Sequence, residues 1–283
     1  MKAMVTGGGG FIGSHLIEVL KNRGYNTKTF DRSNGFDIRD RGDLRSQMED
    51  CDVVFNLAGV LGTHELNKRK EIPRAIDVNI SGAVNVLDVA AEFDVDVVEI
   101  CKPNPWLNTY SITKEAAEKF TKLYVKEHDL DAWMVRWYNV YGPKQHYGKP
   151  QKLVPTVAVD ALRGDDINIY GNGEQTADHI YVRDAVRATV DVYETDEMRG
   201  EVVDIGSGDD RTVNEIAEMI LDFADSDSEI KHIPMRSGEE EETTVRANIT
   251  KLYSKVGFRP EWSLEEGIKK TVEYYDENLE DLS

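Results

Sequence analysis

The stretch Thr6-Gly7-Gly8-Gly9-Gly10-Phe11-Ile12-Gly13 decides the fold of this chain. Residues 2–6 before it are apolar and predict a short strand, and apolar side chains recur at helical spacing through residues 11–23 after it. Glycines at this junction allow a tight turn, let the backbone approach a pyrophosphate, and let the helix lie close to the strand. The N-terminus of the helix then faces the phosphates. The stretch therefore predicts a dinucleotide site built on a strand, a turn and a helix.

An acidic residue follows the second predicted strand, residues 26–30. Asp31 stands where a carboxylate accepts hydrogen bonds from the adenosine ribose and repels a 2′-phosphate, which favours NAD over NADP. Arg32 beside it works in the opposite direction, because an arginine can pair with a 2′-phosphate. Further along, residues 52–59 are an apolar run that ends in small residues, as in a buried parallel strand. Together these segments predict an α/β fold with a parallel sheet and NAD as its ligand.

A phenol and an ammonium lie one helical turn apart in Tyr110-Ser-Ile-Thr-Lys114. Side chains at positions i and i+4 share one face of a helix, so both groups would meet the same site. Together with the glycine turn, this segment resembles the extended short-chain dehydrogenase/reductase family, whose larger branch contains nucleoside-diphosphate-sugar epimerases and dehydratases. The resemblance runs over nearly the whole chain. It implies a Rossmann-type doubly wound parallel sheet with a smaller, interleaved C-terminal domain that binds the substrate.

The resemblance also implies which residues bind the two ligands. Tyr110 and Lys114 are the expected catalytic pair, and Asn79 matches the family asparagine beside the nicotinamide ribose. The residues expected at NAD are Gly7, Gly10, Phe11, Ile12, Gly13, Asp31, Arg32, Asp37, Ile38, Leu57, Ala58, Gly59, Asn79, Tyr110, Lys114 and Tyr138. Those expected at a nucleoside-diphosphate sugar are Asn139, Leu153, Val154, Tyr170, Gln175 and Arg236.

The chain departs from the family after the predicted strand at residues 95–100. Family members carry serines or threonines there and a longer loop, whereas this chain reads Cys101-Lys-Pro-Asn-Pro-Trp-Leu-Asn-Thr-Tyr110. The hydroxyl that shares a proton with the substrate is therefore missing, and its role falls on Thr109, Asn108, Cys101 or water. Neighbouring residues on a strand point apart, so we expect Cys101 to be a core thiol and Lys102 a surface amine.

A second departure concerns the pyrophosphate. The family arginine that grips it is replaced by Ala177, which offers neither charge nor donors. Arg236 is the best candidate to compensate, and Lys144, Lys152 and Arg246 are others. Elsewhere, residues 167–173 resemble a small hairpin beneath the substrate base, and the acidic run at residues 239–242 is interpreted as a solvated loop face.

The expected domain boundaries follow from the resemblance. Residues 1–145 form the NAD-binding domain, to which residues 178–206 return, and residues 146–177 and 207–283 form the substrate domain. Family members commonly dimerise through two helices, which correspond here to the helix that opens at residues 77–82 and the one that begins at Tyr110. We therefore expect a homodimer.

Composition narrows the possible partners. The 283 residues carry a net charge of −19, from 53 acidic and 34 basic residues, which argues against nucleic-acid and anionic-membrane binding. The apolar runs are too short for a membrane span or a signal peptide, so we expect a cytoplasmic protein. Cys51 and Cys101 lack the spacing of a zinc site or a redox dithiol, so reduced thiols and no metal site are expected.

These features predict an NAD-dependent epimerase. Tyr110, as a phenolate, would remove the proton of a sugar hydroxyl while the carbon gives its hydride to NAD, and the transient 4-keto-sugar would take the hydride back on its other face. A 4,6-dehydratase or a decarboxylase of the family uses an acidic residue in the segment missing here, and a dehydrogenase is a further alternative. A 3,5-epimerase would need Cys101 and Lys102 as a pair. The alternative from another class is a binding protein without catalysis.

Overall fold

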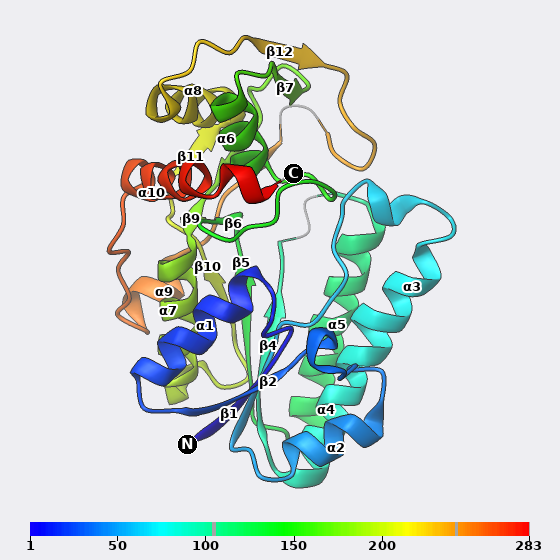
Figure 1. Cartoon of the computed structure of the whole chain (residues 1–283). Coiled ribbons are helices and arrows are strands. Elements are labelled where there is room, and N and C mark those ends of the chain that lie inside the picture. Colours follow the sequence, from blue (N-terminus) through cyan, green and yellow to red (C-terminus); the bar gives the residue numbers. More distant parts are fainter. Residues whose placement is uncertain (104–105, 241–242, 283) are drawn as a thin grey trace.

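Six parallel strands form the central sheet of the protein (Figure 1). The computed structural model describes residues 1–103, 106–240 and 243–282. The strand order is β10-β5-β4-β3-β1-β2, so the chain starts inside the sheet, moves outward to β2 and then crosses to β3 on the other side of β1. Ligands of doubly wound sheets bind at such a switch point, which confirms the predicted architecture and locates the site. The strand bounds are β1 Lys2–Thr6, β2 Asn26–Phe30, β3 Val53–Asn56, β4 Asp96–Cys101, β5 Ala132–Trp137 and β10 Val202–Ile205.

Helices cover both faces of this sheet (Figure 1). On one face lie α1 and α7, where Leu16 and Leu20 of α1 are fully buried. On the other lie α2, α4 and α5, where Leu44 and Leu87 belong to the same buried cluster as Met4 of β1. Burial on both faces explains why inner strands such as β3 are apolar, whereas the edge strand β2 is largely polar and only partly buried. The helix bounds are α1 Phe11–Asn22, α2 Arg41–Met48, α4 Ala83–Phe93, α5 Thr109–Glu127 and α7 Val182–Tyr193.

The helix expected to open at Asp77 begins earlier than predicted. The preceding helix, α3 (Ile72–Ile76), has Pro73 in its first turn, where a proline is tolerated because the N–H at that position has no helical partner. A π-helical turn, η3 (Asp77–Gly82), then connects α3 directly to α4. Turns of this kind are rare and occur frequently at functional sites. This one carries Asn79, a residue predicted at the cofactor.

Most of the rest of the chain forms a smaller layer of helices and short strands beyond the carboxyl ends of the sheet strands, whereas α9 packs against β10 at the edge of the sheet (Figure 1). In this layer α6, α8 and α10 pack together, and α8 and α10 each begin with a capping box, at Thr212 and Ser263. No helix among the described residues is long and apolar enough to cross a membrane. The bounds are β6 Val140–Tyr141, α6 Leu153–Arg163, β7 Ile167–Tyr170, β8 Thr176–Asp178, β9 Ile180–Tyr181, β11 Asp210–Thr212, α8 Val213–Ala224, β12 Ile230–Ile233, β13 Thr244–Val245, α9 Thr250–Ser254 and α10 Leu264–Glu277.

The small hairpin expected at residues 167–173 does not form. Instead, β7 pairs in parallel with β12, and β8 joins β11 and β13 in a separate three-stranded sheet. Gly171 and Gly173, both with positive φ, turn the chain between β7 and β8. The N–H of Gly171 donates to the carbonyl of Ile233 rather than to a returning strand. The expectation failed because the true partner of β7 lies far along the chain.

Candidate active site

Two cavities meet at Tyr110, where the sheet faces the C-terminal layer. The first, which we call the sheet cavity, has a volume of about 480 Å³ and is lined by Phe11 at the start of α1, Leu57 after β3 and other residues. The second, which we call the C-terminal cavity, has a volume of about 270 Å³ and is lined by residues such as Tyr170 and Arg236. Ligands in the two cavities would therefore meet at Tyr110. The residues that line both cavities are Lys102, Tyr110, Trp137, Asn139, Pro150, Lys152, Leu153 and His179.

The glycine turn beside the sheet cavity leaves no room for side chains. Gly7 has a φ of +67°, a left-handed conformation that glycine adopts readily. A Cβ on Gly13 would collide with the carbonyl of Gly7, and the N–H of Gly10 donates to that same carbonyl at 3.0 Å. Helix α1 begins at the next residue, Phe11. The backbone thus forms the cradle that a dinucleotide pyrophosphate requires at a helix N-terminus.

Asp31 follows β2 and lies beside this turn. Its carboxylate accepts hydrogen bonds from the N–H of Gly9 at 3.1 Å and from the N–H of Ser33 at 2.9 Å. Partial burial opposes its charge, but these hydrogen bonds outweigh burial and hold the pKa of Asp31 below its usual value. A charged carboxylate at the end of the second strand fits the ribose of NAD.

The start of α5 fixes where Tyr110 lies. The side chain of Asn108 caps the helix, since its oxygen accepts a hydrogen bond from the N–H of Ser111 at 2.9 Å. Tyr110 and Lys114 follow on one face of α5 and both line the sheet cavity. Burial raises the pKa of the Tyr110 phenol, and the charge of Lys114 works against that rise.

A buried carboxylate in β4 anchors Lys114. The Lys114 ammonium lies 3.3 Å from a carboxylate oxygen of Glu99, which is fully buried. The amide of Asn56 in β3 donates to the other oxygen of Glu99 at 2.6 Å and accepts from the hydroxyl of Thr6 at 2.7 Å. Burial opposes the charge of Lys114, but the attraction of Glu99 and of Tyr110 outweighs it and raises the pKa of Lys114. Sequence reasoning missed Glu99, although one acidic residue within an apolar strand is a visible signal.

Lys102 directly follows β4 and lines both cavities. Its Nζ donates to the hydroxyl of Ser111 at 2.9 Å and lies 5.4 Å from the centre of the Tyr110 ring. Burial, together with repulsion from Lys152, lowers the pKa of Lys102 to about 8. The prediction of a surface amine was therefore wrong, because this end of the strand opens on the cavities rather than on solvent. Lys102 stands at the strand end where the family hydroxyl is missing.

The other candidates for the role of the missing hydroxyl were Thr109, Asn108 and Cys101. None of them lines both cavities as Lys102 does. Thr109 is buried, lines neither cavity and donates its N–H to Asn67 at 2.8 Å. Asn108 is used as the cap of α5. Cys101 is buried at the edge of the sheet cavity, and burial raises the pKa of its thiol well above the usual range. His179, which sequence reasoning did not consider, lines both cavities, and burial lowers its pKa.

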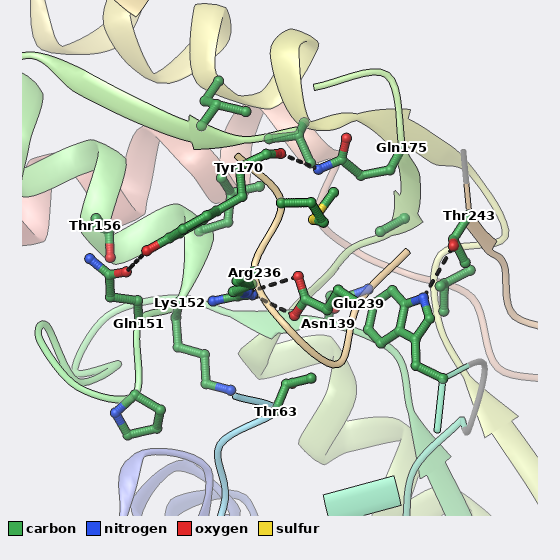
Figure 2. A pocket seen from close by; sticks show the side chains of 18 of the residues that line it. Thr63, Asn139, Gln151, Lys152, Thr156, Tyr170, Gln175, Arg236, Glu239 and Thr243 are labelled. Atoms are coloured by element: carbon green, nitrogen blue, oxygen red, sulfur yellow. Dashed lines mark hydrogen bonds and ion pairs between the residues drawn. The ribbon is translucent and has the colours of Figure 1, made fainter. Parts of the chain in front are cut away.

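Figure 2 shows the C-terminal cavity, where most of the predicted substrate residues gather. Arg236 is held by the carboxylate of Glu239 at 2.8 and 2.7 Å and lies 5.2 Å from the centre of the Tyr170 ring. Burial and repulsion from Arg236 lower the pKa of Lys152, which precedes α6. Glu239 is thus not on a solvated face as expected, and residues 241–242 of the acidic run lie outside the described residues. The predicted residues that line this cavity are Asn139, Leu153, Tyr170, Gln175 and Arg236, and Val154 lines the sheet cavity.

Tyr138 lies away from both cavities, although it was predicted at the cofactor. Its hydroxyl donates to the carboxylate of Asp204 at 3.1 Å. Trp137 and Asn139 on either side of it line the cavities, and successive side chains of extended chain point in opposite directions. Tyr138 therefore points toward Asp204 rather than into a cavity, and the contact of this segment with the cofactor stays a prediction.

Asn79 also lines neither cavity, and the same holds for these other predicted cofactor residues: Gly7, Gly10, Gly13, Asp31, Arg32, Asp37, Ile38 and Ala58. The Asn79 amide accepts from the N–H of Val60 at 2.8 Å and donates to the carbonyl of Val60 at 2.9 Å, which holds the loop after β3. Its contact with NAD stays a prediction. Of these other residues, Asp37 pairs with Arg39, Ile38 is buried and Arg32 is exposed.

Known proteins resemble the chain along its whole length. It is 30% identical to the UDP-N-acetyl-alpha-D-glucosaminuronate decarboxylase of Bacillus cytotoxicus, over 98% of both chains. It is 31% identical to the low-salt glycan biosynthesis protein Agl12 of Haloferax volcanii, over 97% of this chain and 98% of that protein. The UDP-glucose 4-epimerase of Thermotoga maritima, solved with UDP-glucose, is 28% identical and superposes with a TM-score of 0.91 over 99% of this chain and 100% of that one. Residues 3–206 match the family described as NAD dependent epimerase/dehydratase. The chain therefore belongs to the NAD dependent epimerase/dehydratase family of enzymes that modify nucleoside-diphosphate sugars, and its cofactor is NAD.

Proposed function

We propose that the protein is an NAD-dependent epimerase of a nucleoside-diphosphate sugar that acts through a 4-keto-sugar. The observation that carries this proposal is the position of Tyr110 at the meeting point of the two cavities, with Lys114 one turn further along α5. The sheet cavity lies beside the glycine cradle and suits the nicotinamide end of NAD. The C-terminal cavity, with Arg236 and Lys152, suits the diphosphate and the sugar.

The chemistry assigned to the chain's own residues is a proton transfer. Tyr110, as a phenolate, accepts the proton of the sugar 4-hydroxyl while the hydrogen on the same carbon leaves as hydride and a carbonyl forms. NAD, when bound, supplies the hydride acceptor and a positive ring that favours the phenolate. Return of the hydride to the opposite face of the sugar, with the proton from Tyr110, gives the epimer. Lys114 favours the phenolate through its charge, and Glu99 holds Lys114 in place.

An epimerase is favoured over a dehydratase or a decarboxylase because it requires no further acid or base. Among the described residues, no carboxylate lines the sheet cavity around Tyr110. The carboxylates of Glu65, Glu239 and Glu240 line the C-terminal cavity, and that of Glu239 is held by Arg236. The relatives include both activities, since one is a decarboxylase of an acidic sugar and another a 4-epimerase. The reaction must therefore be distinguished by its product.

The test is proton NMR of the purified protein with NAD and a panel of UDP-, GDP- and dTDP-sugars. Epimerisation gives a new epimer at equilibrium without stoichiometric NADH. A 4-keto-6-deoxy product would identify a dehydratase instead, and loss of the sugar carboxylate a decarboxylase. Binding of NAD with every sugar unchanged would favour the binding protein without catalysis.

We also propose that two copies pair through α5 and the continuous helical segment α3–η3–α4, the two helices that the resemblance implies. Apolar side chains are exposed along these neighbouring helices, with Ile76 exposed by 45%, Ile112 by 51%, Phe120 by 37% and Leu123 by 45%. Exposed apolar side chains on adjacent elements mark association surfaces in soluble proteins. Light scattering should give a dimer for the wild type and a monomer for the double variant Ile112→Asp/Leu123→Asp. A monomeric wild type would contradict the proposal.

A further inference from the structure

Two lysines occupy the junction between the cavities without a carboxylate partner. Lys102 and Lys152 both line both cavities. Among the described residues neither forms an ion pair, and the recorded side-chain bond of Lys102 goes to the neutral hydroxyl of Ser111. Other cations nearby are neutralised, since Lys114 is paired with Glu99 and Arg236 with Glu239. Glu65 and Glu239 attract these lysines only from a distance, so the junction holds two ammonium groups that lack an ion-pair partner among the described residues.

A buried ammonium without a counter-ion is costly, because it has lost water and gained no opposite charge. The cost is removed when the ligand brings the negative charge. Lys152 can be explained by the diphosphate of the substrate, which would supply the negative charge. Lys152 lies close enough to Arg236 for mutual repulsion, and it lines the same cavity as Ala177, where the family arginine is missing. Lys102 remains to be explained.

Lys102 lies where the sugar would bind rather than where the diphosphate would bind. It lies over the ring of Tyr110, the group that contacts the reacting hydroxyl in the proposed function, and it bonds to Ser111 on the same helix turn. A neutral sugar offers hydroxyls, which accept a hydrogen bond from an ammonium but do not cancel its charge. A carboxylate does both, through a charge-assisted hydrogen bond. The positive ring of bound NAD adds to the need for negative charge at this point.

We propose that the sugar of the substrate carries a carboxylate and that Lys102 pairs with it, so that the substrate is a nucleoside-diphosphate uronic acid. This inference rests on the proposed function for the presence of a nucleoside-diphosphate sugar beside Tyr110. It assigns Lys102 to substrate selection, through a positive charge that a hydroxyl at this strand end would not supply.

The test compares matched sugars that differ in the carboxylate alone, UDP-glucose with UDP-glucuronate and UDP-N-acetylglucosamine with UDP-N-acetylglucosaminuronate. The wild type should prefer the acidic member of a pair in kcat/KM. Loss of one charge-assisted hydrogen bond costs about 10- to 100-fold, so Lys102→Met should lower kcat/KM for the acidic sugar by about that factor. The same variant should lower the value for the neutral sugar by a clearly smaller factor, and Lys102→Arg should retain the preference. Lys255→Met, an exposed lysine paired with Glu197, is the matched control and should change neither value.

Lys102→Met should unfold at or above the wild-type temperature, because it removes a buried ammonium without an ion-pair partner, and it should still bind NAD, which separates lost recognition from lost folding. Equal turnover of acidic and neutral sugars by the wild type would overturn the inference and leave the epimerase intact. An equal loss on both sugars in Lys102→Met would also overturn it. If the acidic sugar loses its carboxylate, or binds in a Lys102-dependent way without reacting, the inference stands and the epimerase assignment fails.

Discussion

The glycine turn and the link between β4 and α5 serve the same active site but differ in how they follow the family pattern. Between β1 and α1, the geometry of the backbone determines which residues fit, since a side chain on Gly13 would collide with the carbonyl of Gly7. Between β4 and α5, charged side chains decide, with Glu99 and Lys102 on either side of the strand end. The cofactor is the same throughout the family, whereas the sugars and reactions differ. The difference teaches that a backbone cradle preserves cofactor binding while a short side-chain link can change what the enzyme accepts.

The largest expected effect comes from the phenol where the two regions meet. Tyr110→Phe removes the proton acceptor and leaves the ring, so turnover should fall by about 10²- to 10⁴-fold. NAD binding should be unchanged because the glycine cradle is intact. The measurement is the rate of product formation by NMR, with NAD affinity from fluorescence quenching. Tyr124→Phe, on the same helix but bonded to Asp88, is the control. Unchanged turnover of Tyr110→Phe would remove this group from the mechanism.

The role of Glu99 in the link between β4 and α5 can be tested through the free energy of unfolding. Glu99→Gln leaves the buried ammonium of Lys114 without its counter-charge, and breaking a buried pair in this way costs about 3 kcal/mol or more in the free energy of unfolding. The double variant Glu99→Gln/Lys114→Met removes both charges and should recover much of that loss. Urea unfolding measures both values. If the single variant is as stable as the wild type, the pair does not anchor α5 to β4.

The glycine turn between β1 and α1 can be tested by a substitution at Gly13. In Gly13→Ala the added Cβ meets the carbonyl of Gly7, and such overpacking costs about 1–3 kcal/mol. Because the strain falls on the cradle, the affinity for NAD should drop by about tenfold or more, as measured by calorimetry. Gly42→Ala, in the first turn of α2, is the control and should bind NAD normally. An unchanged affinity in Gly13→Ala would show that the cradle tolerates a side chain.

The same contrast explains how far the sequence could predict the structure. The glycine turn, the central strands and the Tyr110–Lys114 pair are local patterns, and their elements appear where they were predicted. Lys102 was assigned to solvent because alternation along a strand predicts that it points away from Cys101, but β4 ends at Cys101 and both residues line the sheet cavity. The partner of β7 could not be found because β12 lies far along the chain. Long-range placement, rather than residue type, was the missing information.

The pH dependence of binding sharpens the comparison further, although its expected effect is the smallest. The ammonium of Lys102 faces Ser111 and Tyr110 of α5, Lys152 before α6, and Glu239, and its pKa is lowered to about 8. Below that pH it is charged and can pair with a carboxylate, and a carboxylate bound to it raises its pKa in the complex. Affinity for an acidic sugar, measured with NAD present, should therefore be greatest below pH 8 and fall by about tenfold per pH unit just above it. Lys102→Met should remove this dependence, whereas Gly13→Ala, which alters only the cradle, should keep it. A wild-type affinity that stays level through pH 8 and 9 would show that the charge at the strand end does not act on the sugar.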